Sequence, residues 1–202
     1  MIDSKSLAWD KMDGLLPAVV QDADTSQILM LGYMNQAALE TTVATRFVTF
    51  FSRSKGRLWR KGESSGNVLA LVKLAADCDR DALLVQARAE GPTCHLGTDS
   101  CFGGEPTGSG WLAKLERIIA ERAAASPEES YTSRLLADGP AKAAQKVGEE
   151  GVEVALAAVS RDERGLAEES ADLLFHLLVT LRSRGVPLAE VLRVLRERHA
   201  RA

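Results

Sequence analysis

The sequence predicts two domains of different fold class: an N-terminal domain that is mostly β with some helix (α+β), and a C-terminal all-α helical bundle. Between residues 15 and 87, apolar residues come in short runs bounded by turn residues, which is typical of strands. Beyond residue 110, alanine, leucine, glutamate and arginine dominate, which favours helices. The stretch GGEPTGSG at 103–110 has the composition of a flexible linker. We therefore expect one domain at 1–110, including this linker, and the other at 111–202.

Strands are expected wherever an apolar run of the N-terminal domain is bounded by turn signals. One helix interrupts them at 36–45. Asn35 is a suitable N-cap for this helix, because its side-chain oxygen can accept a hydrogen bond from a free N–H of the first turn. The expected strands cover 17–22, 27–34, 46–52, 58–62, 67–79 and 82–87.

The C-terminal domain is divided into helices by proline and glycine residues, which end helices. Short connections between helices favour antiparallel packing, and we expect a second copy of the chain to complete the bundle. The expected helices are 111–125, 131–137, 140–160, 163–184 and 188–200, with breaks at Pro127, Gly139, Pro140, Gly185 and Pro187.

Composition and charge argue against several classes of protein. The chain has 202 residues, a formal net charge of −3 and no basic stripe of the kind that binds nucleic acid. No apolar run has the length needed to cross a bilayer, so we expect no membrane partner. The number of cysteines is odd and no apolar N-terminal segment resembles a signal peptide, so we expect a reduced protein in the cytoplasm.

The stretch from Asp77 to Cys101 contains metal ligands of two kinds. Zinc selects thiols, whereas carboxylate oxygens suit magnesium. If 75–81 is extended, alternation sends the aspartates to one face and the intervening cysteine to the other, so we expect two metal sites rather than one mixed site. The candidate zinc ligands are Cys78, Cys94 and Cys101, and the candidate magnesium ligands are Asp77, Asp79 and Asp81. The alternatives are buried structural thiols and, for the aspartates, a solvated strand face or turn.

Three thiols leave a tetrahedral zinc with one open position, which is typical of a zinc that activates water. His95, next to Cys94, is a candidate fourth ligand or proton-transfer group. We favour proton transfer, because the side chains of adjacent residues diverge on an extended backbone and seldom chelate one ion.

The stretch SRSKGRLWRKGESSGN at 52–67 suits a phosphate, because it combines cations with glycine and hydroxyl residues. An aromatic side chain within it offers a flat face for a base. The alternative is a solvated hairpin loop with the tryptophan in the core. The candidate substrate-binding residues are Arg53, Ser54, Arg57, Trp59, Lys61, Gly62, Glu63 and Ser64.

Two C-terminal helices carry carboxylates at three- and four-residue spacing, so these groups project from neighbouring positions. Their mutual repulsion is relieved if a divalent cation lies between them. Magnesium held in this way usually also binds substrate phosphates, so we expect hydrolysis within a polyphosphate. The alternative is a pair of solvated helix faces in which lysines form salt bridges. The candidate ligands are Glu149, Glu150, Glu153, Glu169 and Asp172, with Glu150 also as the expected catalytic carboxylate; Lys142 and Lys146 are candidate substrate-binding residues.

These motifs are similar to those of two enzyme families of histidine biosynthesis. Residues 17–105 resemble phosphoribosyl-AMP cyclohydrolase through LMLGYMN, SRSKGRLWRKGESSGN, DCDRDALL and GPTCHLGTDSCF. Residues 112–200 resemble phosphoribosyl-ATP pyrophosphohydrolase, which acts one step earlier, through KVGEEGVEVALAA and EESADLLFHLLVTL. The chain is therefore similar to the fused, bifunctional form of these enzymes.

The resemblance implies that the C-terminal domain binds the ATP moiety of phosphoribosyl-ATP and hydrolyses it to phosphoribosyl-AMP and pyrophosphate. The N-terminal domain would then open the adenine ring of phosphoribosyl-AMP with zinc-activated water. The resemblance also implies Zn²⁺ on the three cysteines, with Cys78 supplied by the partner subunit of a homodimer, and Mg²⁺ on both carboxylate groups. The alternative is a zinc-binding interaction module fused to a helical dimerisation domain or to a house-cleaning nucleotide pyrophosphatase.

Overall fold

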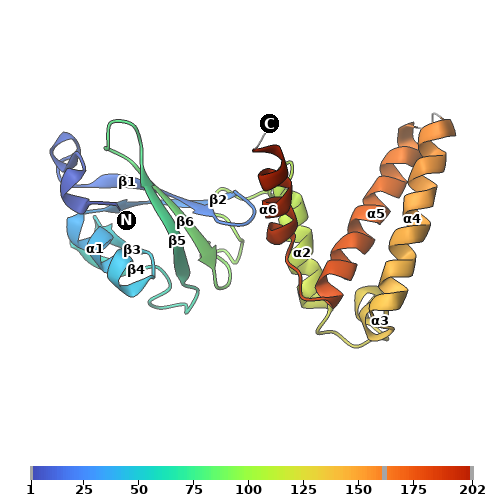
Figure 1. Cartoon of the computed structure of the whole chain (residues 1–202). Coiled ribbons are helices and arrows are strands. Elements are labelled where there is room, and N and C mark those ends of the chain that lie inside the picture. The colour runs from blue at the N-terminus through green and yellow to red at the C-terminus, as the bar shows by residue number, and fades with distance from the viewer. Residues whose placement is uncertain (1, 161–162, 201–202) are drawn as a thin grey trace. The chain divides into compact units, whose positions relative to one another are not determined.

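The computed structural model describes residues 2–160 and 163–200 (Figure 1). The chain forms two compact units, Met1–Trp111 and Leu112–Ala202. The first unit is rich in strands and the second is helical, which confirms the predicted fold class. Across the described residues, no helix combines the length and the apolar character that crossing a membrane would require.

A four-stranded sheet in the order β2-β1-β6-β5 forms the centre of the first unit (Figure 1). β1 pairs parallel with β6 and antiparallel with β2, while β5 pairs antiparallel with β6. A separate antiparallel pair is made by β3 and β4. The strands are β1 (Leu16–Asp22), β2 (Ile28–Met34), β3 (Thr49–Ser52), β4 (Arg57–Arg60), β5 (Leu69–Ala76) and β6 (Leu83–Ala89); the helical elements are η1 (Ser4–Ser6), η2 (Trp9–Met12) and α1 (Gln36–Thr45).

The core of the first unit follows the two-residue period of its strands. Alternate residues of β1 are buried, beginning with Leu16, because successive side chains point to opposite faces of the sheet. Phe50 of β3 packs into this core, and its ring occupies the space that a side chain at Gly32 would need. Asn35 caps α1 as predicted, since its side chain accepts a hydrogen bond from the N–H of Ala38 at 2.8 Å.

The connection between β5 and β6 differs from the prediction. The expected strand at 67–79 ends at Ala76, and the chain reverses over 77–82 to let β6 pair with β5. Arg80 lies in this turn with φ of 65°, in the left-handed region. The assumption of an extended backbone at 75–81 is therefore wrong, and a turn, rather than strand alternation, arranges the aspartates and Cys78.

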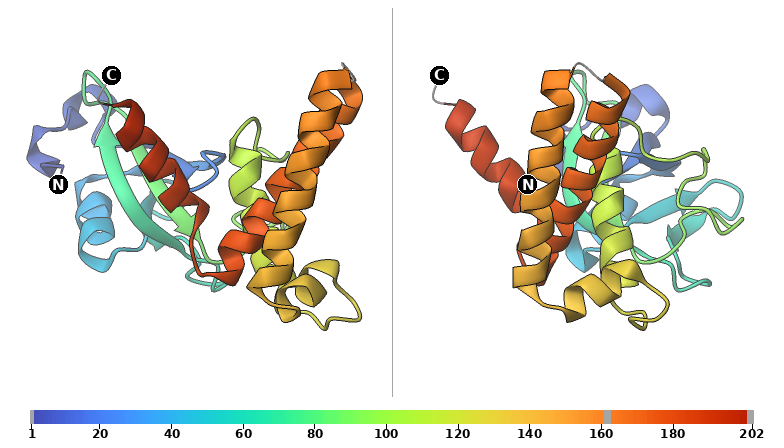
Figure 2. Two further views of the ribbon diagram at one scale, coloured as in Figure 1. Left: turned by 45° about the vertical axis from the view of Figure 1, so that its right-hand side comes forward. Right: turned by 90° about the vertical axis from the view of Figure 1, so that its right-hand side faces the viewer.

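The helices of the second unit begin and end within three residues of the predicted positions. The long helices α4 and α5 lie side by side, as both views of Figure 2 show. The helices are α2 (Gly110–Arg122), α3 (Tyr131–Ala137), α4 (Pro140–Ser160), α5 (Glu163–Ser183) and α6 (Leu188–His199).

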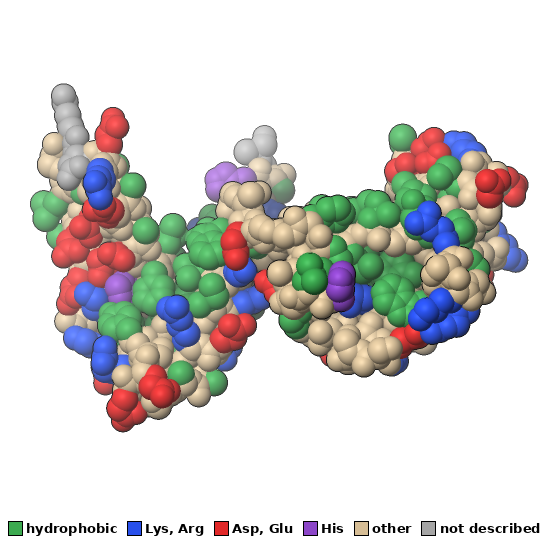
Figure 3. All heavy atoms as spheres, turned by 180° about the vertical axis from the view of Figure 1, so that it is seen from behind, with side chains coloured by type: hydrophobic (Ala, Val, Ile, Leu, Met, Phe, Trp, Pro, Cys, Tyr) green, Lys and Arg blue, Asp and Glu red, His purple; other side chains and the backbone are tan. Residues whose placement is uncertain are grey.

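The core of the second unit is small. It contains Ile119, Leu135, Ala143, Leu178 and Val179. Leu174 and Leu177 of α5 are exposed, because no described element of the unit covers that part of the helix. Apolar and acidic side chains both reach the surface of this unit (Figure 3). Further exposed apolar residues of α4 are Val152, Leu156 and Val159.

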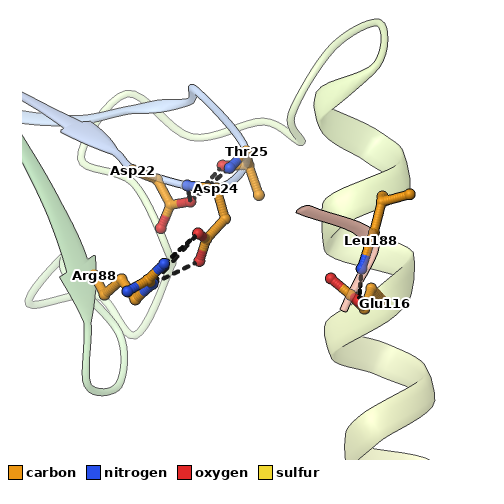
Figure 4. Close-up of polar contacts among 6 residues, drawn as sticks. All are labelled: Asp22, Asp24, Thr25, Arg88, Glu116 and Leu188. Carbon is orange, nitrogen blue, oxygen red and sulfur yellow. Dashed lines mark hydrogen bonds and ion pairs between the residues drawn. The ribbon is translucent and has the colours of Figure 1, made fainter. Parts of the chain in front are cut away.

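Polar contacts close a turn in the first unit and cap a helix in the second (Figure 4). In the first unit, the turn after β1 is closed by the N–H of Thr25, which donates to Asp22 Oδ1 at 2.8 Å. Arg88 of β6 pairs with Asp24 of the same turn at 3.0 Å. In the second unit, Glu116 of α2 accepts a hydrogen bond from the N–H of Leu188 at 2.6 Å, which caps α6 in the absence of a side-chain cap from its own N-terminus.

Candidate active sites and metal centres

Two of the three cysteines line a pocket of about 380 Å³ in the first unit, here called the thiol pocket. Cys94 and Cys101 lie on the loop after β6. The N–H of Cys101 donates to the carbonyl oxygen of Leu29 at 2.8 Å, and this bond fastens the loop to β2. The pocket is also lined by the expected substrate-binding residues Trp59, Lys61, Gly62, Glu63 and Ser64, and by His95.

The two thiols influence each other. The pKa of Cys94 is lowered, mainly by a hydrogen bond from the backbone N–H of Leu96 and further by the side chains of Thr98 and Cys101. The pKa of Cys101 is raised by burial and by the neighbouring Cys94, while the ammonium group of Lys61 opposes this rise. Since the thiolate is the form that binds zinc, Cys94 is the better prepared of the two candidate ligands.

His95 lies beside these thiols on the open side of the pocket. Its Nδ1 is 3.9 Å from Cys94 Sγ, and the side chain is exposed. Lys61 is buried in the same pocket, where its Nζ lies 3.4 Å from the carbonyl oxygen of Asn67. The pocket therefore presents two sulfurs, an imidazole and an ammonium group to one space.

Cys78 is not part of the thiol pocket. It is exposed in the turn at 77–82, between two of the expected magnesium ligands. A single chain therefore brings together two of the three expected zinc ligands and presents the third elsewhere on its surface.

The aspartates of this turn do converge. One carboxylate oxygen from each of Asp77, Asp79 and Asp81 lies within 4.8 Å of the others, a spacing at which they could hold one cation. Asp77 also accepts hydrogen bonds from the N–H groups of Asp81 at 3.0 Å and Ala82 at 3.1 Å, which closes the turn. The structure brings together the three aspartates that the sequence singled out, through a turn rather than the favoured strand, and magnesium binding by them stays a prediction.

A second pocket, of about 450 Å³, shares Met30 and Trp59 with the thiol pocket. Arg53 and Ser54 line it, and the guanidinium carbon of Arg53 lies 3.9 Å from the centre of the Tyr33 ring. The ring holds the guanidinium flat without neutralising its charge. The expected substrate-binding residues are thus divided between two adjoining pockets.

Arg57 and Glu63 were both expected to bind substrate, and they pair with each other. Arg57 Nη2 lies 2.6 Å from Glu63 Oε1, and this contact lowers the pKa of Glu63. Their charges compensate each other, which leaves Arg53 and Lys61 as the stronger candidates for binding phosphate.

In the second unit, carboxylates of α4 and α5 converge on one position. One oxygen from each of Glu150, Glu169 and Asp172 lies within 4.8 Å of the others. Glu150 is buried, with 6% of its side chain exposed. The pKa of Glu153 is raised, first because it shares a hydrogen bond with Glu169 and then because of the neighbouring negative charges. Such crowding favours a divalent cation at this position.

Lysines border this carboxylate group. Lys146 Nζ lies 2.7 Å from Glu149 and 3.0 Å from Glu150, and these contacts raise the pKa of Lys146. Lys142 donates to Gln145 at 3.1 Å. Lys146 therefore forms the salt bridges that were considered as the alternative to metal binding. These salt bridges also place its ammonium group beside Glu150, one of the three converging carboxylates.

Three contacts of these sites could not be read from the motifs. Lys11 of η2 lies 2.8 Å from Asp79. Tyr131 contacts His176, and His176 contacts Glu150. Lys11 and Asp79 are 68 residues apart, and Tyr131 and His176 are 45 apart. Glu150 and His176 lie on different helices, so no local spacing signals any of these contacts.

Known proteins resemble both units. The family model of phosphoribosyl-AMP cyclohydrolase matches residues 30–103, and that of phosphoribosyl-ATP pyrophosphohydrolase matches residues 112–199. A histidine biosynthesis bifunctional protein HisIE of Xylella fastidiosa is 58% identical over 193 residues, which cover 96% of this chain and 93% of that protein. The HisIE of Vibrio vulnificus is 54% identical over 199 residues, or 97% and 94% of the two chains. That of Vibrio cholerae is 55% identical over 194 residues, or 95% and 92%.

Proposed function

The chain belongs to the family of histidine biosynthesis bifunctional proteins and has phosphoribosyl-AMP cyclohydrolase and phosphoribosyl-ATP diphosphatase activities; on this premise we propose which residues perform each reaction. We assign the cyclohydrolase to residues 1–110 and the pyrophosphohydrolase to residues 111–202. The two family matches support this boundary, since they leave only 104–111 between them. The interaction-module alternative has no comparable support.

The carboxylate group of α4 and α5 is the proposed site of pyrophosphate release. The observation that carries this assignment is the convergence of Glu150, Glu169 and Asp172 within 4.8 Å, with Glu150 buried. Glu149 and Glu153 lie on the same helix and extend the group. Magnesium bound there would neutralise charge on the polyphosphate and polarise the attacking water.

Lys146 and Lys142 are the proposed phosphate-binding cations of this site. The ammonium of Lys146 now lies 3.0 Å from Glu150. When a divalent cation binds these carboxylates, the ammonium group of Lys146 would be free to pair with the substrate phosphates. The reaction would break the bond between the α and β phosphates and leave phosphoribosyl-AMP.

The thiol pocket is the proposed site of ring opening. Cys94 and Cys101 line it together with His95, and thiol donors are those that zinc prefers. Zinc on these thiols and Cys78 would activate water for attack on an electron-poor carbon of the adenine ring. His95 would carry the proton between this water and the ring, and Trp59 would support the flat base.

Phosphoribosyl-AMP carries a phosphate at each end, and the two adjoining pockets suit such a substrate. The base would lie against Trp59, which both pockets share, with one phosphoribosyl end toward Lys61 and the other toward Arg53. Ser54 and Ser64 would donate hydroxyl hydrogen bonds to the phosphates, and Gly62 would allow close approach of the backbone. The Asp77, Asp79 and Asp81 group would hold magnesium.

The protein is proposed to work as a homodimer in the cytoplasm. Val152, Leu156 and Val159 are exposed on α4, which favours burial against a second copy of the helical unit. Cys78 lies outside the thiol pocket of its own chain, so a second copy is also a suitable source of the third thiol. A reducing compartment suits zinc binding, since all three cysteines are free thiols.

The substitution Glu150→Ala tests the assignment of the two reactions. The variant should release no pyrophosphate from phosphoribosyl-ATP but should still open the ring of supplied phosphoribosyl-AMP, because the carboxylates and thiols lie in different units. Both products are measured on one protein preparation. Loss of both activities in a folded variant would contradict independent sites.

A further inference from the structure

His176 and Tyr131 lie behind the carboxylate group of α4 and α5. His176 Nδ1 is 3.4 Å from Glu150 Oε1 and 2.9 Å from the carbonyl oxygen of Asp172, one turn earlier in α5. Its Nε2 is 3.0 Å from the hydroxyl of Tyr131, on α3. The imidazole is almost completely buried, with 7% of its side chain exposed.

These contacts define what each ring nitrogen does. A carbonyl oxygen and a carboxylate oxygen can only accept hydrogen bonds, so Nδ1 carries a proton. It donates this proton to the Asp172 carbonyl oxygen, with Glu150 Oε1 as a close neighbour. Nε2 faces a hydroxyl, which can donate or accept. The Nδ1 proton is therefore donated to the Asp172 carbonyl, and the same N–H edge of the ring lies 3.4 Å from Glu150 Oε1 whichever way the Tyr131 hydroxyl points.

The imidazole is also held by aromatic packing. Its ring meets Phe175 edge-on at 5.2 Å and Tyr131 edge-on at 6.0 Å between centroids, and Tyr131 stacks on Phe175. The packing and the two hydrogen bonds fix the ring so that its Nδ1 edge stays beside the buried Glu150 carboxylate.

We propose that His176 and Tyr131 form a positioning pair that orients the Glu150 carboxylate for binding the divalent cation. Neither residue would touch the cation. Outer groups of this kind fix the direction of a ligand, and losing one typically costs about 10- to 100-fold in metal affinity or activity. The inference rests on the proposed assignment of Glu150 as a metal ligand.

Two substitutions of His176 separate this role from packing. The amide nitrogen of His176→Asn can occupy the Nδ1 position, whereas that of His176→Gln reaches toward the Nε2 position. We expect His176→Gln to weaken Mn²⁺ binding about tenfold or more, and His176→Asn to stay within about threefold of the parent. Binding is measured by electron paramagnetic resonance on the full chain without substrate, and the sites lost in Glu150→Gln identify the helical site.

His199→Gln is the matched control. His199 makes the same bond to a carbonyl one turn earlier, from Nδ1 to Leu195 at 2.9 Å, but it is exposed on α6, outside the carboxylate group. This variant should bind Mn²⁺ like the parent. Ring opening by the first unit and the thermal unfolding temperature report whether each variant is folded.

Tyr131→Phe decides the question if both His176 variants fail to fold. It removes only the hydroxyl of a half-exposed tyrosine and keeps the aromatic stack. A weakening of Mn²⁺ binding by about threefold or more supports the pair, and an unchanged affinity overturns it. Equal affinities for His176→Asn and His176→Gln would also overturn it. If Glu150→Gln loses no Mn²⁺ site, the ligand assignment itself is wrong.

Discussion

The ammonium group of Lys11 lies beside the position that a cation would take among the aspartates of the 77–82 turn. Its Nζ is 2.8 Å from Asp79 and 3.5 Å from Asp81. It lowers the pKa of Asp79, chiefly through this hydrogen bond. Arg80 of the same turn donates to the carbonyl oxygen of Ser6 at 3.3 Å, so the N-terminal segment is held against the aspartates. Magnesium would have to compete with Lys11 for two of its ligands.

We therefore predict that Lys11→Met raises the affinity of this site for magnesium. The increase should be modest, about threefold, because exposed ion pairs are weak. Calorimetric titration in a chain that also carries Glu150→Gln removes the contribution of the helical site. The control is Lys5→Met in the same segment, because Lys5 makes no ion pair within the described residues. An affinity that falls, or that rises equally in both variants, contradicts the competition.

His95 is predicted to transfer protons without binding zinc. Its Nδ1 is 3.9 Å from the sulfur of Cys94, and it faces the thiol pocket from an exposed position. His95→Ala should lower the turnover of ring opening by roughly 100-fold or more, the usual contribution of a general base, while zinc remains bound. The decisive measurement is the zinc content of the purified variant, since a ligand would take the metal with it when removed.

At the scale of helices and strands, local patterns predicted most of the fold. Hydrophobic runs located the strands, and glycine and proline located the ends of the helices, because these signals act within a few residues. The 77–82 turn was considered only as an alternative, because its residues carry no glycine or proline and strand pairing between Ala76 and Leu83 is what reverses the chain. The contacts of Lys11 and Tyr131 were missed for a related reason, since only the fold brings them to their partners.

The crowded carboxylates of α4 and α5 lead us to expect that a divalent cation stabilises the helical unit. The pKa of Glu153 is raised from its ordinary value of 4.5, mainly by Glu169. Its protonated form therefore favours folding below that value, and this contribution is lost as the pH rises through the raised pKa. The pKa of Glu149 is lowered by Lys146, so its contribution has the opposite sign and is lost as the pH falls.

Two glutamine substitutions should then have opposite effects at pH 7.5 without metal. Glu153→Gln should raise the unfolding temperature, because it removes a repelled charge, and it should reduce the further rise on adding magnesium. Glu149→Gln should lower the unfolding temperature, because it removes a partner of Lys146. Thermal unfolding by circular dichroism, with and without magnesium, measures both. If Glu153→Gln lowers the unfolding temperature instead, repulsion from Glu150 and Glu169 does not destabilise the helical unit.

At the scale of the whole molecule, the sequence assigned each of the two activities to a unit of the correct fold class. It could not predict which surfaces would contact another copy of the chain. Val152, Leu156 and Val159 on α4, and Leu174 and Leu177 on α5, recur at three- and four-residue spacing, so periodicity alone assigns them to a core. In the described chain they are exposed, and that a second copy completes the bundle stays a prediction.

The same reasoning leads to a test of a shared zinc site. Cys94 and Cys101 line the thiol pocket, whereas Cys78 lies on the exposed turn at 77–82, so each site would combine two thiols of one chain with Cys78 of its partner. Cys78→Ser and Cys94→Ser chains should each fail to open the ring when alone. In a mixed dimer, one site has lost both Cys78 and Cys94, while the other retains all three thiols. Random exchange of equal amounts should therefore restore about a quarter of the parent ring-opening activity, as expected for a twofold-symmetric interface. Pyrophosphate release, which uses the other unit, should stay constant and report the amount of folded protein. An inactive mixture in which mass spectrometry detects mixed dimers would place all the zinc ligands in one chain.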